Sequence, residues 1–386
     1  MIKNLDDIAW FQEGPGVRNY QYTTNGTKLI NVSNLGGINL NLSNTSRYIS
    51  NEEANGKYRH FLCDVGDLVI ASSGINETSI SEKVSIVKKD DLPLCMNTSV
   101  IRFKPLNNDE VSVKYLYYFF KSDSYKKQIM KLMTGIAQLN YGPSHLHKIK
   151  INYVEKAQQE QITNQLDLLS SLVETLKKQL TLFDELIKSR FIEMFGDVGK
   201  NNKHFMVKPM GNVCEVTSSH RVFTTEFVKE GIPFYRGKEI GELAAGIEPK
   251  DPFCISKRRY EQLSSDNTKP KIGDILIPSI CNKEQVWMVN TESPFYYKDG
   301  RVLSISPNRD LFNCKYFETY FKLKSSEEYP KLGSGSTFAE FKIFLLKDMD
   351  VILPPKSLQD KFASFVEQVD KSKFVVHSRY FLCDIL

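Results

Sequence analysis

The chain has 386 residues, a length that predicts two or three domains, each large enough to bury a core. Its hydrophobic content of 41% and charged content of 25% are ordinary for a soluble globular protein, and its net charge of +5 is only mildly basic. No apolar run approaches the roughly 18 residues of a membrane span, and residues 1–14 do not resemble a signal peptide. The seven cysteines are scattered without a CxxC pair, so we expect reduced thiols, no metal site and a cytoplasmic location.

Residues 1–155 are predicted to form a mixed α/β domain, because short β-rich runs alternate there with turn residues before one helical segment. The expected elements are strands at residues 28–32, 67–71 and 99–103, a helix near residues 113–133, and a last strand at residues 149–154. Between the helix and the last strand lies a loop that Gly135 and Gly142 bracket.

Residues 156–198 are predicted to form one long helix. Apolar side chains recur there at alternating steps of three and four residues, which is the pattern of a coiled-coil seam. Such a helix would be roughly 60 Å long. A helix buried in a single core is the alternative, but it should be apolar on more than a narrow stripe. We therefore predict a spacer that needs a partner helix, with the seam residues Leu166, Leu169, Val173, Leu176, Leu180, Phe183 and Ile187.

The order of motifs starts again after the long helix. The segments that begin at Gly26, Gly66 and Lys114 have counterparts that begin 205, 207 and 201 residues later. The Gly-bounded loop at Gly135 recurs at Gly333. Matches in the same order with a near-constant offset indicate a tandem duplication of a domain plus a helix.

The duplication predicts an α+β fold of two similar mixed α/β domains and two long helices. We place the second domain at residues 199–355 and a distal helix at residues 356–386. Its seam residues Phe362, Val366 and Val369 stand 200 residues after positions of the first seam. The two helices are expected to form an antiparallel coiled coil that holds the domains apart.

Motifs of common DNA enzymes are missing from the sequence. The single Pro-Pro pair, at Pro354, lacks the following aromatic residue that an amino-methyltransferase site needs. Residues 231–238 depart from a P-loop in spacing, and the Glu-x-Lys tripeptides at Glu248 and Glu340 lack the Pro-Asp partner of a common nuclease site. Duplicated domains on a spacer, without an evident reaction centre, favour a binding protein.

Each predicted domain carries basic residues among aromatics and amides in turn-rich segments. Lys and Arg neutralise phosphates, and Arg, Asn and Gln also read base edges. A solvated polar surface is the competing interpretation for any single residue, but the clusters together favour a nucleic-acid partner. They comprise residues 18–22, 47–48 and 57–59 in the first domain and residues 220–221, 235–238, 257–260 and 269–271 in the second.

Several runs along the chain resemble the specificity subunits of type I restriction–modification systems. The runs Gln158–Ile162, Leu176–Gln179 and Phe191–Asp197 resemble the central helical region of that family. Residues 273–277 and 352–362 resemble its second target-recognition domain and the exit into the distal helix. The resemblance covers the whole chain but is weak inside the recognition domains.

The resemblance implies that each domain reads one half of a bipartite sequence in double-stranded DNA. It implies that the coiled coil sets the gap between the halves. It further implies that two modification subunits dock on the helices and bring S-adenosylmethionine for adenine N6-methylation. A restriction subunit would add translocation and cleavage, driven by ATP with Mg²⁺. This chain would hold no cofactor and no activity of its own.

By their position in the domains of this family, some segments are expected to face DNA. They are residues 18–22 and 218–221, and the late loops near the end of each domain at residues 138–141 and 334–337. Gln138 and Asn140 carry amides able to pair with adenine, although the bracketing glycines equally suit a structural turn. The expected contacts are Arg18, Tyr20, Lys57, Gln138, Asn140, Tyr141, Arg221, Arg236, Lys238, Ser334 and Ser336.

The C-terminal stretch departs from the family pattern. Residues 374–379 break away from the heptads, and residues 379–383 show no helical stripe. We therefore expect a truncated distal helix that leaves the seam uncovered near Phe183 and Ile187 and weakens docking of one modification subunit. Two other functions stay open: a standalone DNA-modifying enzyme, and a coiled-coil adaptor between proteins without a DNA role.

Overall fold

The computed structural model describes residues 1–43, 45–133, 140–266, 268–280, 285–332 and 339–385. Its contacts divide the chain into two units, residues 1–172 and residues 173–386, and the division falls inside one long helix. Each unit therefore holds one domain and part of that helix. Within the described ranges, no helix combines the length and apolar character needed to cross a membrane.

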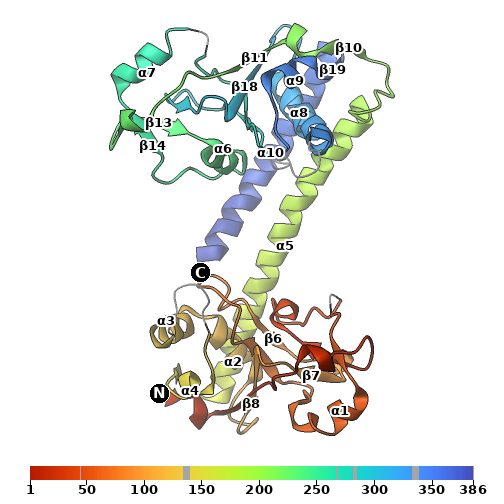
Figure 1. Cartoon of the computed structure of the whole chain (residues 1–386), viewed down its shortest axis with the longest axis vertical. Coiled ribbons are helices and arrows are strands. Elements are labelled where there is room, and N and C mark those ends of the chain that lie inside the picture. The colour runs from red at the N-terminus through yellow and green to blue at the C-terminus, as the bar shows by residue number, and fades with distance from the viewer. Residues whose placement is uncertain (44, 134–139, 267, 281–284, 333–338, 386) are drawn as a thin grey trace. The chain divides into compact units, whose positions relative to one another are not determined.

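The first unit is built on a four-stranded sheet, β2-β8-β5-β6, and a three-stranded sheet, β4-β3-β7, while β1 pairs with β9 (Figure 1). Its strands are β1 (Ile2–Asn4), β2 (Ala9–Glu13), β3 (Thr27–Ile30), β4 (Tyr48–Ile49), β5 (Leu68–Ala71), β6 (Val84–Ile86), β7 (Leu94–Met96), β8 (Val100–Pro105) and β9 (Lys150–Asn152). Its α-helices are α1 (Asn51–Asn55), α2 (Val113–Lys121), α3 (Asp123–Leu132) and α4 (Pro143–Leu146). The long helix α5 (Lys156–Phe195) follows.

Helix α2 packs its apolar side on the four-stranded sheet of the first unit. Leu116 and Phe120 of α2 share one buried cluster with Leu68 of β5 and Phe103 of β8. The rings of Phe103 and Phe120 have their centroids 4.6 Å apart. Burying each such side chain contributes about 1.5–3 kcal/mol. These contacts fix the sheet on which the loops of the domain are mounted.

The predicted helix at residues 113–133 is two helices that meet at Ser122, so the expectation of one helix was wrong. Ser122 has an extended backbone, and its hydroxyl accepts a hydrogen bond from the backbone N–H of Tyr125 at 3.3 Å. A serine in this geometry is an N-cap, which starts a new helix. The apolar periodicity runs across the break and therefore does not show it.

The second unit repeats this plan with a four-stranded sheet, β11-β18-β15-β16, a second sheet, β12-β14-β13-β17, and the pair β10-β19. Its strands are β10 (Met206–Pro209), β11 (Cys214–Ser218), β12 (Phe227–Val228), β13 (Ile232–Tyr235), β14 (Phe253–Ile255), β15 (Ile275–Pro278), β16 (Trp287–Met288), β17 (Tyr296–Tyr297), β18 (Val302–Pro307) and β19 (Asp350–Leu353). Its α-helices are α6 (Gly237–Ala244), α7 (Lys257–Leu263), α8 (Cys314–Glu328), α9 (Ile343–Asp348) and α10 (Lys356–Ile385).

The same turn precedes the central strand of both four-stranded sheets. Gly66 and Gly273 have φ angles of +88° and +85°, a region that favours glycine. The next residue in each copy, Asp67 or Asp274, accepts a backbone N–H three residues earlier at 2.8 Å. The repeated Gly-Asp pair of the sequence is therefore a turn that delivers the buried strands β5 and β15. The predicted duplication and α+β fold are confirmed.

Helix α5 ends in the aromatic core of the second unit. Phe191 and Phe195 of α5 both lie with ring centroids 5.5 Å from that of Phe362 of α10. Tyr316 of α8 stacks on Phe191 at 5.7 Å and meets Phe195 edge-on at 4.7 Å. Three helices thus share one cluster, which buries the seam residues Phe362 and Val366. The third seam residue, Val369, is buried as well.

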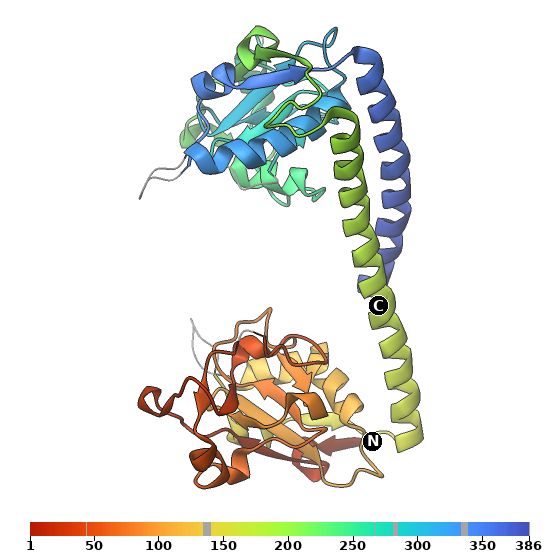
Figure 2. The same cartoon turned by 90° about the vertical axis from the view of Figure 1, so that its right-hand side faces the viewer.

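Helices α5 and α10 run antiparallel beside each other within the second unit (Figure 2). Their contacts step in opposite directions along the two helices. Arg190 lies over Phe365 at 5.7 Å, Lys373 donates to Asp184 at 2.6 Å, and Lys177 lies over the ring of Tyr380 at 5.5 Å. The predicted antiparallel pairing is confirmed.

Two expectations about α10 were wrong. The helix continues to Ile385 instead of breaking near residues 374–379. No Gly or Pro occurs in its 30 residues, so an α-helix propagates even where the apolar stripe is lost. Phe183 and Ile187 are half-buried, and the α10 contacts described above lie on both sides of them, so this part of the seam is covered.

The other seam residues follow the same pattern. Leu176 is buried, and Leu166, Leu169, Val173 and Leu180 are half-buried. The apolar residues of α5 left mostly exposed lie outside the seam, namely Leu168, Leu172, Leu182, Leu186 and Ile192. The division of the chain at residues 155, 198 and 355 stays a prediction.

Candidate nucleic-acid interface

Gln21 shapes the loop that follows β2 in the first unit. It ends a 3-10 turn at Asn19–Gln21, and its side-chain oxygen accepts from the backbone N–H of Arg18 at 3.0 Å. Its side-chain nitrogen donates to Glu53 of α1 at 2.7 Å and to the Tyr58 hydroxyl at 3.0 Å. The loop and α1 are therefore fixed together. Arg18 and Tyr20 point outward from this loop, and Tyr20 keeps 85% of its surface exposed.

Lys57 lies close to this loop. Its ammonium is 5.0 Å from the centroid of the Tyr58 ring. Its interaction with the Tyr58 hydroxyl, with a smaller contribution from the negative charge of Glu53, raises the pKa of Lys57. The structure therefore brings the predicted contacts Arg18, Tyr20 and Lys57 to one part of the domain. Two cations beside an exposed aromatic ring suit contact with phosphate and sugar.

Tyr141 belongs to the core, so the expectation that its side chain faces DNA was wrong. Its backbone N–H donates to Ser72 O at 3.0 Å, and its buried hydroxyl donates to Ala71 O at 2.6 Å. Burial raises the pKa of this hydroxyl. Phe341 takes the same place in the second unit and donates its N–H to Ser279 O at 2.7 Å. Both late loops therefore return to the sheet through one matched hydrogen bond.

Asn140, next to this anchor, is exposed, and its contact with DNA stays a prediction. Gln138, Ser334 and Ser336 lie outside the residues that the structure describes. Their assignment to DNA stays a prediction.

In the second unit, hydrogen bonds hold residues 218–220, which lie at the end of β11 and directly after it. The Ser218 hydroxyl donates to Val302 O at 3.0 Å, and His220 contacts the Asp266 carboxylate at 2.5 Å through its Nε2. Hydrogen bonds from Thr268 and His220 lower the pKa of Asp266 to about 2. Arg221 then projects outward as an exposed side chain.

Arg236 and Lys238 lie at the start of α6, but Arg236 is already paired. Its guanidinium donates to Glu239 at 2.8 Å, and its backbone N–H donates to the same carboxylate at 2.8 Å. Burial disfavours the charged form of Glu239, yet the hydrogen bonds from Arg236 outweigh this and lower its pKa. Lys238 is exposed and 3.5 Å from Glu242. Lys238 is therefore the more available cation of the two.

Two exposed aromatic residues beside these arginines were missed by the sequence reasoning. The Arg221 guanidinium lies 5.2 Å from the ring of Phe223, and that of Arg236 lies 4.6 Å from the ring of Phe253. Such rings offer flat apolar surface against which a sugar or base can pack. The two-residue spacing from Arg221 to Phe223 is a signal that the sequence contains. Phe253 is distant from Arg236 in sequence and gives no such signal.

A cavity of about 430 Å³ lies beside η4 (Arg59–Phe61) in the first unit. Its buried wall is Arg102, which donates to Gln12 at 2.8 Å and to His60 O at 2.7 Å and pairs with Asp67 at 3.3 Å. Trp10 lies 5.2 Å from the same guanidinium. Because these partners all belong to the domain, Arg102 acts here as a cross-link between strands and the η4 turn.

The part of the chain that the structure describes contains no cluster of three side chains able to hold a metal ion. Burial raises the pKa of the Cys95 and Cys214 thiols to about 12, which keeps both protonated at neutral pH. The candidate site is therefore a set of exposed cations and aromatics on loops carried by two similar domains.

Comparison with known proteins identifies the family. The model of the type I restriction modification DNA specificity domain matches residues 1–182 and 202–378. The MjaIX specificity subunit of a type I restriction enzyme from Methanocaldococcus jannaschii is 25% identical over 299 residues, which cover 71% of this chain and 66% of that protein. The chain thus spans slightly under two thirds of that relative. The putative MjaX specificity subunit of the same organism is 24% identical and covers 83% of this chain and 74% of its own length.

A solved structure shows the same fold. The S subunit of a type I restriction–modification system from M. genitalium matches 100% of this chain and 93% of its own chain, with a TM-score of 0.53 and 16% identity. Together with the family match to both halves, this accounts for the repeated domain and helix described above. The chain belongs to the family defined by the type I restriction modification DNA specificity domain and carries that domain twice.

Proposed function

We propose that this chain is the DNA sequence-recognition subunit of a type I restriction–modification complex. Each recognition domain reads one half of a bipartite site, and α5 with α10 sets the gap and docks two modification subunits. The observation that carries the proposal is the duplication, since the family model matches each half separately and each half ends in a long helix. Two similar readers suit a site of two halves.

The exposed cations support the DNA role. Arg18 and Lys57 in the first unit and Arg221 and Lys238 in the second are all exposed. Such cations would bind phosphates with an affinity that falls as salt rises. Amides on the neighbouring loops, such as that of Asn140, would add base contacts.

The chemistry would belong to the partner subunits. We propose that the modification subunits bring S-adenosylmethionine and that a restriction subunit brings ATP with Mg²⁺. This chain would then act in the cytoplasm without catalysis of its own. The two relatives from Methanocaldococcus jannaschii are themselves named as specificity subunits of type I restriction enzymes.

The test is to map methylated adenines in cells that express this chain with its modification subunits. We expect one asymmetric motif of two short halves separated by a fixed, unspecified gap. Replacing residues 1–155 by the same domain of a relative should change one half only. A motif without a gap, or methylation that does not depend on this chain, would contradict the proposal.

The two rival functions give different results. A standalone modifying enzyme would bind S-adenosylmethionine as the isolated chain, which equilibrium dialysis measures. A protein adaptor would form the complex with modification subunits but would not increase the affinity of that complex for duplex DNA.

A further inference from the structure

Two buried glutamines occupy the same position in the two copies. Gln159 is the fourth residue of α5 and Gln359 the fourth residue of α10, 200 positions apart. Neither has any exposed surface. A buried amide is costly unless its polar atoms are all paired, so the partners of these side chains define what they do.

Gln159 connects three backbone segments of the first unit. Its oxygen accepts from the N–H of Ser112, the N-cap residue of α2, at 2.9 Å. Its nitrogen donates to Glu110 O at 2.9 Å and to Val154 O, just after β9, at 2.7 Å. One acceptor and two donors are thereby satisfied. The side chain connects the start of the long helix α5 to helix α2 and to the end of strand β9.

Gln359 repeats this arrangement in the second unit. Its oxygen accepts from the N–H of Asn313, the N-cap residue of α8, at 2.9 Å. Its nitrogen donates to Leu311 O at 3.0 Å and to Pro354 O, just after β19, at 2.8 Å. All three bonds thus have direct counterparts in the first unit.

The first residue of each long helix reinforces the glutamine. Lys156 donates to Asn108 O at 2.8 Å, and Lys356 donates to Arg309 O at 2.6 Å and to Phe312 O at 2.8 Å. We call the pair Lys156 and Gln159 the first joint, and the pair Lys356 and Gln359 the second joint. These side chains all bond to backbone atoms, so a joint holds a fixed geometry whatever the sequence of the loops.

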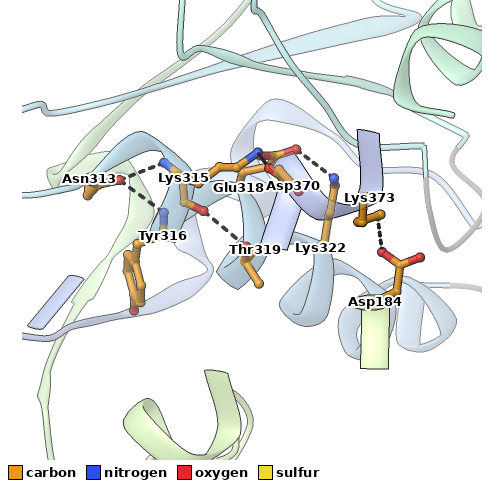
Figure 3. A network of polar contacts seen from close by, with 9 residues as sticks. All are labelled: Asp184, Asn313, Lys315, Tyr316, Glu318, Thr319, Lys322, Asp370 and Lys373. Atoms are coloured by element: carbon orange, nitrogen blue, oxygen red, sulfur yellow. Dashed lines mark hydrogen bonds and ion pairs between the residues drawn. The ribbon is translucent and has the colours of Figure 1, made fainter. Parts of the chain in front are cut away.

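One ion pair between domain and helix is also repeated, Lys114–Asp167 in the first unit and Lys315–Asp370 in the second, but the contacts around it differ. In the first unit the Tyr118 hydroxyl donates to Asp167 of α5 at 2.7 Å. In the second unit Lys315 of α8 bridges Glu318 at 3.2 Å and Asp370 of α10 at 3.0 Å (Figure 3). The duplication therefore keeps this ion pair and, bond for bond, the three hydrogen bonds of each buried glutamine.

We propose that the two joints fix the orientation of each recognition domain on its helix and so determine which gap length in the DNA is accepted. This inference rests on the proposed function. In B-DNA one added base pair rotates a half-site by roughly 35° and shifts it by about 3.4 Å. A spacer helix rejects that change only if the domain cannot turn on the helix. Gln159 and Gln359 are thus positioning residues for specificity.

The test uses the complex with its modification subunits and a DNA library in which the gap between the two half-sites varies. Gln159→Met and Gln359→Met keep the side-chain length and remove the three hydrogen bonds. The matched control is Gln158→Met, at an exposed neighbouring position. We expect the complex with the wild-type chain to methylate only DNA sites that have one particular gap length.

In each joint variant, the preference for the native gap over gaps one base pair longer or shorter should fall by about tenfold or more, because three buried hydrogen bonds are lost. The bases preferred within each half-site should stay unchanged, and the control should behave as wild type. Retention of the single gap by both joint variants would overturn the inference. Absence of any gapped motif with the wild type would instead overturn the proposed function.

A second measurement needs no variant and covers the case in which Gln159→Met fails to fold. Hydrogen exchange of the wild-type chain should show the Ser112 and Asn313 amides protected as strongly as those of the central strands β5 and β15. Rapid exchange of these two amides would show that the joints open in the native state and would overturn the inference.

Discussion

Single arginine side chains hold the turns of both recognition domains by bonding to backbone and to a buried aspartate, Asp67 or Asp274. Arg309 donates to Gly273 O at 2.8 Å and pairs with Asp274 at 2.7 Å. Arg102 pairs with Asp67, the counterpart of Asp274, at 3.3 Å. Arg102 lies on β8, and Arg309 follows β18. The same turn is therefore stabilised from two different strand positions, which a comparison of the repeats by sequence cannot show.

At this scale the clearest test concerns Tyr141, whose hydroxyl donates to the buried Ala71 O. Tyr141→Phe should lower the free energy of unfolding of the first unit by about 1 kcal/mol, because one buried acceptor loses its partner. The loss should be small because phenylalanine already fills this place in the second unit, as Phe341. Unfolding in urea, monitored by hydrogen exchange of the β5 amides, measures the change in free energy.

The control for this prediction is Tyr20→Phe, at an exposed hydroxyl, which should change stability by less than about 0.5 kcal/mol. DNA affinity should be unaffected by Tyr141→Phe, because its ring is a core residue. A large loss of affinity without loss of stability would restore Tyr141 as a DNA contact.

At the scale of elements, the heptad pattern predicted α5 well because the seam is sustained and free of helix breakers. It predicted α10 poorly at its C-terminal end, where the stripe fades but the helix continues. Lys373 interrupts the apolar seam in sequence, yet it pairs with Asp184 of α5. An apolar pattern reports which face is buried, whereas the end of a helix depends on residues that stop it.

The pairing of α5 and α10 should therefore depend on its aromatic end more than on its ion pair. Phe362→Ala should cost about 3–5 kcal/mol, because it leaves a cavity among Phe191, Phe195 and Tyr316. Lys373→Ala should cost about 1 kcal/mol or less, because Asp184 is mostly exposed. Denaturant unfolding of the full chain compares the two variants. Equal losses would contradict this account of the coiled coil.

The ion-pair network around Glu318 of α8 should contribute less stability in acid. Glu318 is half-buried between Lys322 at 2.7 Å and Lys315 at 3.2 Å, and Lys315 also reaches Asp370 (Figure 3). Burial opposes ionisation of Glu318, but the two ammonium groups outweigh this and lower its pKa. A lowered pKa means that the stabilisation is complete above the ordinary glutamate pKa of about 4.3 and is lost as the pH falls below it.

The measurement is the melting temperature of the second unit between pH 6 and pH 3. Wild type should lose more stability on acidification than Glu318→Gln, which cannot titrate at this position. Glu367→Gln, at an exposed position of α10, should follow the wild-type curve. Parallel curves for wild type and Glu318→Gln would show that this carboxylate does not contribute.

At the scale of the whole molecule, the duplication was the most informative feature of the sequence. It predicted two domains, two helices and their antiparallel pairing, because repeated turn motifs such as Gly66-Asp67 survive in both copies. The exposed cations Arg18, Lys57 and Arg221 could also be predicted, since basic residues in turn-rich loops rarely bury. The buried position of Tyr141 could not, because a tyrosine beside an amide suits a core anchor and a binding loop equally.

If both domains bind one duplex, their phosphate contacts should add. Lys57→Ala and Lys238→Ala each remove one exposed ammonium, so each should reduce the slope of log affinity against log salt by about 0.9. The double variant should reduce it by about twice as much, because the two residues belong to separate units and share no partner in the described structure. The preferred bases should stay the same.

Fluorescence anisotropy of the complex on duplex DNA at several salt concentrations gives the slopes, with Lys178→Ala on the exposed face of α5 as the control. A slope that changes for one domain only would mean that a single recognition domain carries the electrostatic contact with DNA.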